Sequence, residues 1–280
     1  MDRFSEMPSN PLILSVDYLE SIDQIYDSVD VAIIATNADI RRKVIEDLLS
    51  KIKVKYLIME KIVFQNPNDF IPIKTMLIKK GIKSWINCPR RSYTFYQELK
   101  KKLVNKIIHI KVSGQNWGMA CNSIHMVDLL AFLTGQIEMD FNVGDLYKRI
   151  YRSKRDGFLE IRGIMNVVTK GGDSLEIRDS SNIDGKNLVI TISTGNVSYE
   201  IFEITNQLLH FKNGNVTENK INIPLQSENT GIVINNILTK GKCDLTSYEE
   251  CMEYHVPMLK AFNLHFNSIV KNKIYSCPIT

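Results

Sequence analysis

The sequence predicts an α/β fold in two parts: an incomplete Rossmann-like parallel sheet in residues 1–115, then an α+β domain with a largely antiparallel sheet in residues 116–280. In the first part, continuously apolar strand segments alternate with helical segments, which is typical of a parallel sheet covered on both faces. In the second part, short β-forming segments are separated by Gly and Asn turns, which indicates antiparallel hairpins.

Strand–helix units follow one another in the first part. The run VDVAIIATN predicts a buried strand, and after it Val44, Ile45, Leu48 and Leu49 stand at helical spacing. We expect residues 106–114 to form the fourth strand of this same sheet. The other elements expected here are strands at VKYLIMEKI and IKSWINCP, helices at NPNDFIPIKTMLIKKG and RRSYTFYQELKKKL, and, before them, a short strand at 12–16 and a helix at 18–28.

The second part begins with an amphipathic helix within residues 116–135, which Gly135 ends. Four β-rich stretches follow, and the chain becomes helical again from Ser227 to Asn272. The β-rich stretches are GFLEIRGIMNVVTKG, DSLEIRDS, NLVITISTGN and VSYEIFEITNQLLHFKNGN.

Composition excludes several classes of function. Hydrophobic residues make up 44% and charged residues 24%, as in an ordinary globular protein. The net charge of +4 is small, and no aromatic platform accompanies the lysine-rich segment 100–111, so we expect no nucleic-acid partner. No apolar run reaches transmembrane length, and the five cysteines form no CxxC. We therefore expect no membrane partner, free thiols and a cytoplasmic location.

Polar residues follow each of the first three predicted strands. They are ATN after the first strand, EK after the second and NCPRR after the third. Ligands of open parallel sheets bind beyond the carboxyl ends of the strands, so we expect a ligand site there. Asn87, Arg90 and Arg91 would bind an anionic or hydroxyl-rich substrate, since Arg offers a planar fork of donors, or they would only cap and solvate the next helix.

Five segments in this order resemble the Gfo/Idh/MocA family of NAD(P)-dependent oxidoreductases. AIIATN resembles its strand-plus-ATP segment, with Asn37 in place of proline, and MEKI resembles its EKP motif, with Ile62 in place of proline. CNSIHMVDLLAFLTG resembles the helix of its catalytic histidine, with the H-x-x-D-L run beginning at His125. SYEECMEYHVPMLKA resembles a late helix of the family, and CPIT resembles the ending of some members. The likeness covers essentially the whole chain, although each motif alone is weak.

The resemblance implies hydride transfer between NAD or NADP and a hydroxyl or keto group of a sugar or sugar derivative, in surface-polysaccharide metabolism. Oxidising an alcohol also requires removal of a proton from oxygen, which a lysine can take or relay. It implies Lys61 and His125 as catalytic residues, no metal, and a homo-oligomer formed through the second sheet. Ala35, Thr36, Asn37 and Glu60 would line the cofactor, and Asn87, Arg90, Trp117 and Asn122 the substrate.

Two departures from the family leave alternatives open. No glycine precedes Gly81, so we expect the phosphate-binding GxGxxG strand–turn–helix unit to be missing. Loss of three charge-assisted hydrogen bonds weakens cofactor binding by roughly three to six decades.

Cys121 stands where the family carries an aspartate, four residues before His125. The chain would then be a non-catalytic sugar-binding or oligomerisation module, or a hydrolase or transferase with a Cys121–His125 nucleophile.

Simpler explanations apply to single residues. Glu60 and Lys61 would form an exposed pair at a strand end, which contributes little to stability. His125 would be a core histidine, and Trp117 would pack rather than line a sugar. A Cys121–His125 pair would also be half of a metal site, but no third ligand is evident from spacing.

Overall fold

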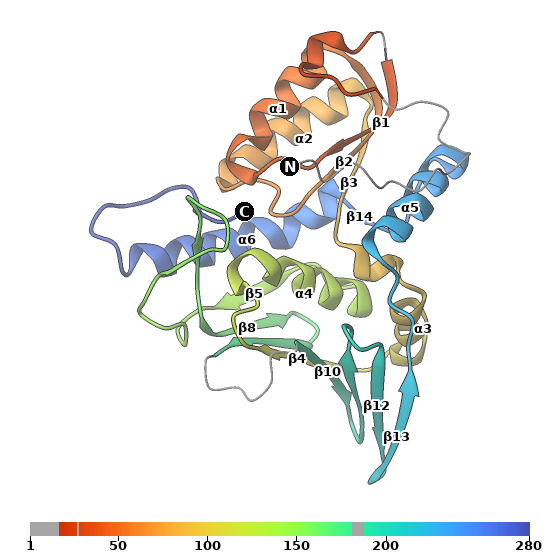
Figure 1. The fold of residues 1–280 in the computed structure, drawn as a ribbon. Helices are drawn as coiled ribbons and strands as arrows, with labels where there is room; N and C mark the ends of the chain where they lie inside the picture. Colours follow the sequence, from red (N-terminus) through yellow and green to blue (C-terminus); the bar gives the residue numbers. More distant parts are fainter. Residues whose placement is uncertain (1–16, 27, 181–187) are drawn as a thin grey trace, which may run out of the picture.

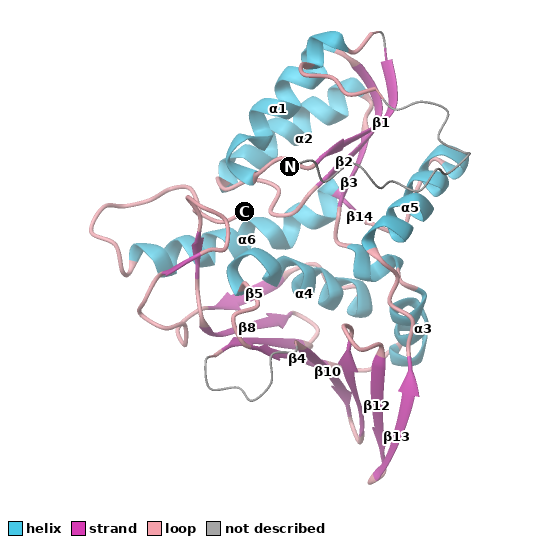
Figure 2. Cartoon of the chain, in the orientation of Figure 1, coloured by secondary structure: helices cyan, strands magenta, loops and turns pink. Residues whose placement is uncertain are grey.

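The computed structural model describes residues 17–26, 28–180 and 188–280, and its strands form two main sheets (Figure 1). The first has the order β1-β2-β3-β14 and the second the order β13-β12-β11-β10-β4-β9-β8-β5. Helix α6 (Tyr248–Asn267) packs against β3 of the first sheet and β5 of the second. The molecule is therefore built as two sheets joined by a shared helical layer (Figure 2).

The first sheet has helices on both faces, as expected. In β2, Leu57 and Met59 belong to the core cluster that includes α1 and α2, whereas Tyr56 and Ile58 pack with Val233 and Ile237 of α5. This double burial explains why β2 is continuously apolar from Tyr56 to Met59. The strands are β1 (Ser28–Ile34), β2 (Lys53–Met59) and β3 (Lys83–Ile86), all parallel, and β14 (Thr246–Ser247), antiparallel to β3; the helices are α1 (Ala38–Lys51), α2 (Phe70–Lys80) and α5 (Gln226–Lys240).

Helix α2 contains a proline without being broken. Pro72 is the third residue of the helix, and the first turn has no intrahelical partner for its N–H groups, so the missing donor has no cost there. Gly81 ends the helix with a φ of 67°, a left-handed conformation that glycine adopts without a steric penalty.

The second sheet is largely antiparallel, with helices α3 (Thr94–Leu103), α4 (Met119–Thr134) and α6 near it. Central strand β4 is parallel to β9 and antiparallel to β10, while the other neighbouring strands are antiparallel. Its strands are β4 (His109–Gly114), β5 (Met139–Asn142), β8 (Gly163–Thr169), β9 (Ser174–Asp179), β10 (Val189–Thr194), β11 (Val197–Phe202), β12 (Gln207–Lys212) and β13 (Asn215–Lys220); β6 (Tyr151–Arg152) and β7 (Leu159–Glu160) form a separate pair.

Strand β4 corrects one prediction. Residues 106–114 were expected to form a fourth strand of the first sheet, but β4 lies in the second. Its side chains alternate: His109 and Lys111 are exposed, whereas Ile110 and Val112 are buried. This alternation belongs to a sheet with one face in solvent rather than to a parallel sheet covered on both faces. The boundary at residue 115 stays a prediction.

The predictions near the chain ends had mixed outcomes. The strand expected at 12–16 lies outside the described residues. The helix expected at 18–28 is wrong, because the described residues of this range contain a 3-10 turn at Ile22–Gln24 and no α-helix. The helical region expected at 227–272 consists of two helices, α5 and α6, separated by residues 241–247, which include β14. No helix among the described residues is long and apolar enough to cross a membrane.

A buried ion pair connects the two sheets. Arg91 lies in the 3-10 turn Pro89–Ser92, shortly after β3, and donates two hydrogen bonds of 3.1 and 2.7 Å to Asp128 of α4. Asp128 is fully buried and also accepts from Tyr254 of α6 at 2.6 Å. Burial raises the pKa of Asp128, and the charge of Arg91 opposes this shift. Arg91 therefore has a structural role, not the substrate role considered from sequence.

We expect Arg91→Met to destabilise the protein by about 3–5 kcal/mol, because it leaves a buried carboxylate without its cation. Urea unfolding followed by circular dichroism measures this. The control is Lys101→Met, which breaks an exposed pair with Glu98 and should change stability by less than about 1 kcal/mol. A loss for Arg91→Met no larger than for the control would show that Asp128 does not depend on this pair.

Candidate functional site

The carboxyl ends of β1, β2 and β3 meet at one edge of the first sheet. The N–H of Glu60 donates to the carbonyl of Ile34 at 3.0 Å, and that of Asn87 donates to Met59 at 2.9 Å. These bonds extend the strand ladder by one step, so the three polar segments predicted from sequence lie side by side. Ala35 and Asn37 are exposed there, while the hydroxyl of Thr36 is buried without a hydrogen-bond partner among the described residues.

Arg41, which sequence reasoning missed, holds this edge together. Its buried guanidinium, on α1, donates to the carbonyls of Thr36 and Ile62, and to that of Val63 at 3.1 Å. Burial lowers the pKa of Arg41 to about 10, so the group stays charged at neutral pH. Arg41 thus fixes the loop after β1 against the segment that carries Lys61, whose peptide bond to Ile62 is cis.

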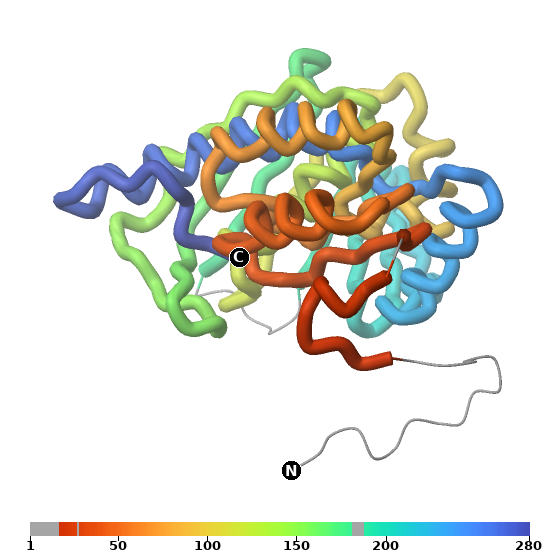
Figure 3. The backbone as a smooth tube through the Cα atoms, turned by 90° about the horizontal axis from the view of Figure 1, so that it is seen from above, coloured from red at the N-terminus to blue at the C-terminus, as the bar shows by residue number. Residues whose placement is uncertain are grey.

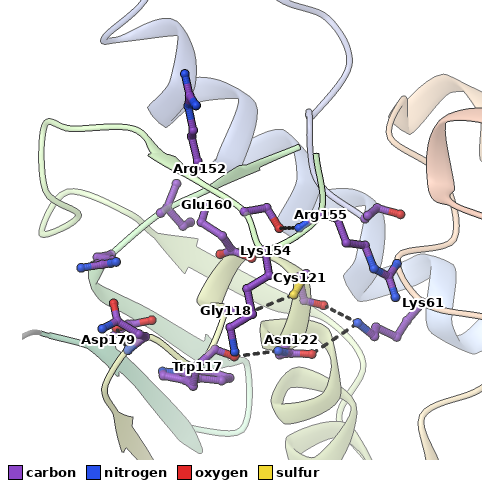
Figure 4. A pocket seen from close by; sticks show the side chains of 15 residues that line it. Lys61, Trp117, Gly118, Cys121, Asn122, Arg152, Lys154, Arg155, Glu160 and Asp179 are labelled. Atoms are coloured by element: carbon purple, nitrogen blue, oxygen red, sulfur yellow. Dashed lines mark hydrogen bonds between the residues drawn. The ribbon is translucent and has the colours of Figure 1, made fainter. Parts of the chain in front are cut away.

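Lys61 reaches from this edge to the first turn of α4. Its Nζ donates to the carbonyl of Cys121 at 3.2 Å and to Oδ1 of Asn122 at 3.3 Å. The amide nitrogen of Asn122 in turn donates to the carbonyl of Trp117 at 2.8 Å (Figure 4). Hydrogen bonds therefore connect three of the residues predicted from sequence, Lys61, Asn122 and Trp117.

His125 lies one turn further along α4 than Asn122. The residue is half-buried, and its Nδ1 is buried without a hydrogen-bond partner among the described residues. Burial lowers the pKa of His125 well below its usual value, and the charges of Arg90 and Lys61 act in the same direction. The imidazole is therefore neutral at pH 7, and its Nδ1 can donate or accept one hydrogen bond, depending on the tautomer.

The predicted site residues divide between two cavities. The first, of about 440 Å³, is lined by Lys61 and Cys121; the second, of about 550 Å³, is lined by Glu60 and His125. Trp117 and Asn122 line both cavities and separate them. Asn87 and Arg90 also line the second cavity, whereas Ala35, Thr36 and Asn37 line neither.

The positive charge of Arg90, which lines the second cavity, is neutralised by Glu203. Arg90 donates from Nε and Nη2 to the carboxylate of Glu203 at 2.9 and 2.6 Å, and the hydroxyl of Tyr96 donates to the same carboxylate. Glu60 accepts a hydrogen bond from the amide of Asn87. The cavity is thus polar but charge-balanced at Arg90, which weakens the case for Arg90 as an anion ligand.

Two buried acids, which were not expected from sequence, hold the start of α4. Glu160 accepts from the N–H of Ala120 at 2.7 Å, and Asp179 accepts from the N–H of Asn116 at 2.9 Å. Burial raises the pKa of both carboxyl groups. Negative charge is favourable at a helix N-terminus, so these acids stabilise the turn that presents Asn122. A carboxylate within the strand-like GFLEIRG was the sequence signal for Glu160.

Cys121 is not an activated nucleophile. Its Sγ donates to the carbonyl of Gly118 at 3.4 Å. Burial raises the pKa of Cys121 to about 12, and the charge of Glu160 adds to this effect. The thiol is therefore protonated at neutral pH, which argues against the Cys121–His125 nucleophile. Among the described residues, no three His, Cys, Asp or Glu side chains are grouped as metal ligands.

The fold is that of solved oxidoreductases. UDP-N-acetylglucosamine 3-dehydrogenase GnnA from Acidithiobacillus ferrooxidans matches with a TM-score of 0.68 and 12% identity, over 88% of this chain and 81% of that chain. An oxidoreductase from Agrobacterium radiobacter in complex with NAD+, L-tartaric acid and magnesium matches at 0.64 and 15%, over 85% and 78%. A Gfo/Idh/MocA family oxidoreductase from Vibrio cholerae matches at 0.60 and 14%, over 87% and 80%.

These similarities establish the fold that the sequence resemblance implied. No family model matches the sequence, and no curated protein matches it either. At 12–15% identity, the activity of these proteins does not transfer with the fold.

We expect iodoacetamide to modify Cys121 at pH 8 at least about a hundredfold more slowly than a free cysteine, because the thiolate is the reactive form. Mass spectrometry of the native protein measures the rate. Cys243 is the internal comparison. Burial raises its pKa to about 11, so its thiol should also be modified more slowly than a free cysteine. Modification of Cys121 at the rate of free cysteine would restore the nucleophile hypothesis.

Proposed function

We propose that this chain, which has the fold of Gfo/Idh/MocA oxidoreductases, transfers hydride between NAD or NADP and a hydroxyl or keto group of a sugar or sugar derivative. The observation that carries the proposal is the position of Lys61. The lysine lies where the first sheet's carboxyl edge meets α4, within hydrogen-bond distance of Asn122. That position matches the lysine of the family motif that the sequence resembles.

The residues present suit the nicotinamide side of a cofactor better than its phosphates. Thr36 offers a buried hydroxyl without a partner among the described residues, and Ala35 and Asn37 are exposed beside it. No glycine precedes Gly81 in the sequence, so the usual glycine-rich phosphate turn is not among these residues. The cofactor, when bound, would accept or donate the hydride.

Lys61 would hold the proton in this reaction. Its Nζ is oriented by two oxygens, the carbonyl of Cys121 and Oδ1 of Asn122, which leaves one donor for a substrate oxygen. His125 is neutral and its Nδ1 is free among the described residues, so it would orient the substrate by a hydrogen bond from the second cavity. Glu60, hydrogen-bonded to Asn87, would anchor rather than react.

A sugar as substrate is also part of the proposal. GnnA is named for a dehydrogenation of UDP-N-acetylglucosamine, and we extend only the class, a sugar or sugar derivative, to this chain. Trp117 and Asn122, which line both cavities, and Asn87 of the second cavity would contact a substrate that reaches across both. Association through the second sheet and a role in surface-polysaccharide metabolism belong to the same proposal.

A second candidate function is a non-catalytic sugar-binding or oligomerisation module. Two observations favour it: the sequence has no glycine before Gly81, and Cys121 is a protonated thiol where the family carries a carboxylate. A neutral thiol cannot take part in a proton relay as a carboxylate does.

Titration of the chain with NADH and NADPH, followed by nicotinamide fluorescence, separates the two candidates. The proposal predicts a Kd for NADH or NADPH below about 1 mM, which corresponds to about −4 kcal/mol.

With a sugar substrate found by screening, Lys61→Met should lower kcat by about 10²–10⁴-fold. Lys79→Met, on the exposed part of α2, is the control. Sugar binding without cofactor binding up to millimolar concentration would favour the second candidate.

A further inference from the structure

The first cavity is lined by several cations that have no acidic partner. Lys61, Arg152, Lys154, Arg155 and Arg162 all line it, and within the described parts of the chain none of them forms an ion pair. Arg90 and Arg91, outside this cavity, are both paired with carboxylates. Five cationic and two acidic side chains, Glu160 and Asp179, line this cavity, so the cationic side chains outnumber the acidic ones.

The two acids of the cavity lower its positive charge but do not cancel it. Glu160 and Asp179 accept hydrogen bonds from backbone N–H groups at the start of α4. The charge of Arg162 acts on Asp179, and its guanidinium stacks on Tyr151 at 4.1 Å. Arg162 is thus engaged, which leaves Arg152, Lys154 and Arg155, together with Lys61, as the cations to consider for a ligand.

Arg155 is held in place by a neutral partner. Its Nη1 donates to Oδ1 of Asn37 at 3.3 Å, which positions the guanidinium near the end of β1 without cancelling its charge. In Figure 4, Arg155 and Lys61 extend toward the same side of the cavity, whereas Arg152 extends away from them. A guanidinium carries five N–H donors, so most of those of Arg155 have no partner in the described part of the chain and can bind an oxyanion.

We infer that the substrate carries an anionic group, a carboxylate or a phosphoryl group, which binds Lys154 and Arg155 in the first cavity while its reacting carbon lies near Lys61. The inference rests on the proposed function, because Lys61 defines the reacting end. A guanidinium forms charge-assisted, often bidentate hydrogen bonds with carboxylate and phosphate oxygens. A neutral sugar would leave these cations without a partner.

Calorimetric titration without cofactor tests the inference, using four probes: glucose, glucuronate, glucose 1-phosphate and UDP. We expect at least one anionic probe to bind at least about tenfold more tightly than glucose. Arg155→Gln and Lys154→Gln should each weaken that binding by roughly tenfold to a hundredfold and leave glucose unchanged. The strongest of the three anions distinguishes a carboxylate from a phosphate or a diphosphate.

Arg152→Gln is the matched control, because it removes one positive charge from the same loop. It should change binding by less than about threefold, as expected for a charge that acts only through screened solvent. An equal effect of Arg152→Gln, equal binding of glucose and the anions, or no binding of any anion would each overturn the inference.

The same variants separate this inference from the proposed function. If Arg155→Gln weakened NADH or NADPH binding but not the binding of the anionic probes, the cations would serve the cofactor and the inference would be wrong. If the wild type bound the anionic probes but neither dinucleotide, the inference of an anionic ligand would be supported and the proposed dehydrogenase function would be contradicted.

Discussion

The buried contact of Arg91 with Asp128 determines how the two sheets face each other. Arg91 follows β3, Asp128 lies on α4 three residues beyond His125, and Tyr254 of α6 completes the network. Because Asp128 is fully buried, this geometry has little freedom. The reach of Lys61 to Asn122 at 3.3 Å crosses the same junction. A candidate site divided between a sheet edge and a helix on another sheet keeps its distances only if that junction is rigid.

Much of the first sheet was predictable because its signal is local. Each of its three parallel strands ends in an apolar run, and a helix follows it. The polar residues of these strands stand at their beginnings and do not interrupt the runs. Strand β4 was assigned to the wrong sheet because it continues the strand–helix order, although Lys111 between Ile110 and Val112 is the alternation of a half-exposed strand. The order of elements was given more weight than the period of the side chains.

Several central residues of the candidate site were predicted from sequence, but the residues that hold them in place were not. Lys61 and Asn122 were expected from motifs, and the structure brings them together. Arg41 and Glu160 were missed because their partners lie 21 and 40 residues away in the sequence, and no local pattern pairs a strand-end carbonyl or a helix start with so distant a side chain. The separation of Lys61 from His125 by Trp117 and Asn122 was likewise invisible, since both were expected around one substrate.

The closure of the first sheet has a consequence for how the chain folds during synthesis. The outer edge of β3 is paired by Thr246 and Ser247, and the N–H of Ala38 at the start of α1 bonds to Thr280 across 242 residues at 2.8 Å (Figure 3). Strands β1 to β3 leave the ribosome long before these partners do. The edge of β3 therefore stays unpaired until the C-terminal segments have been synthesised. Contacts of such long sequence separation make folding slow.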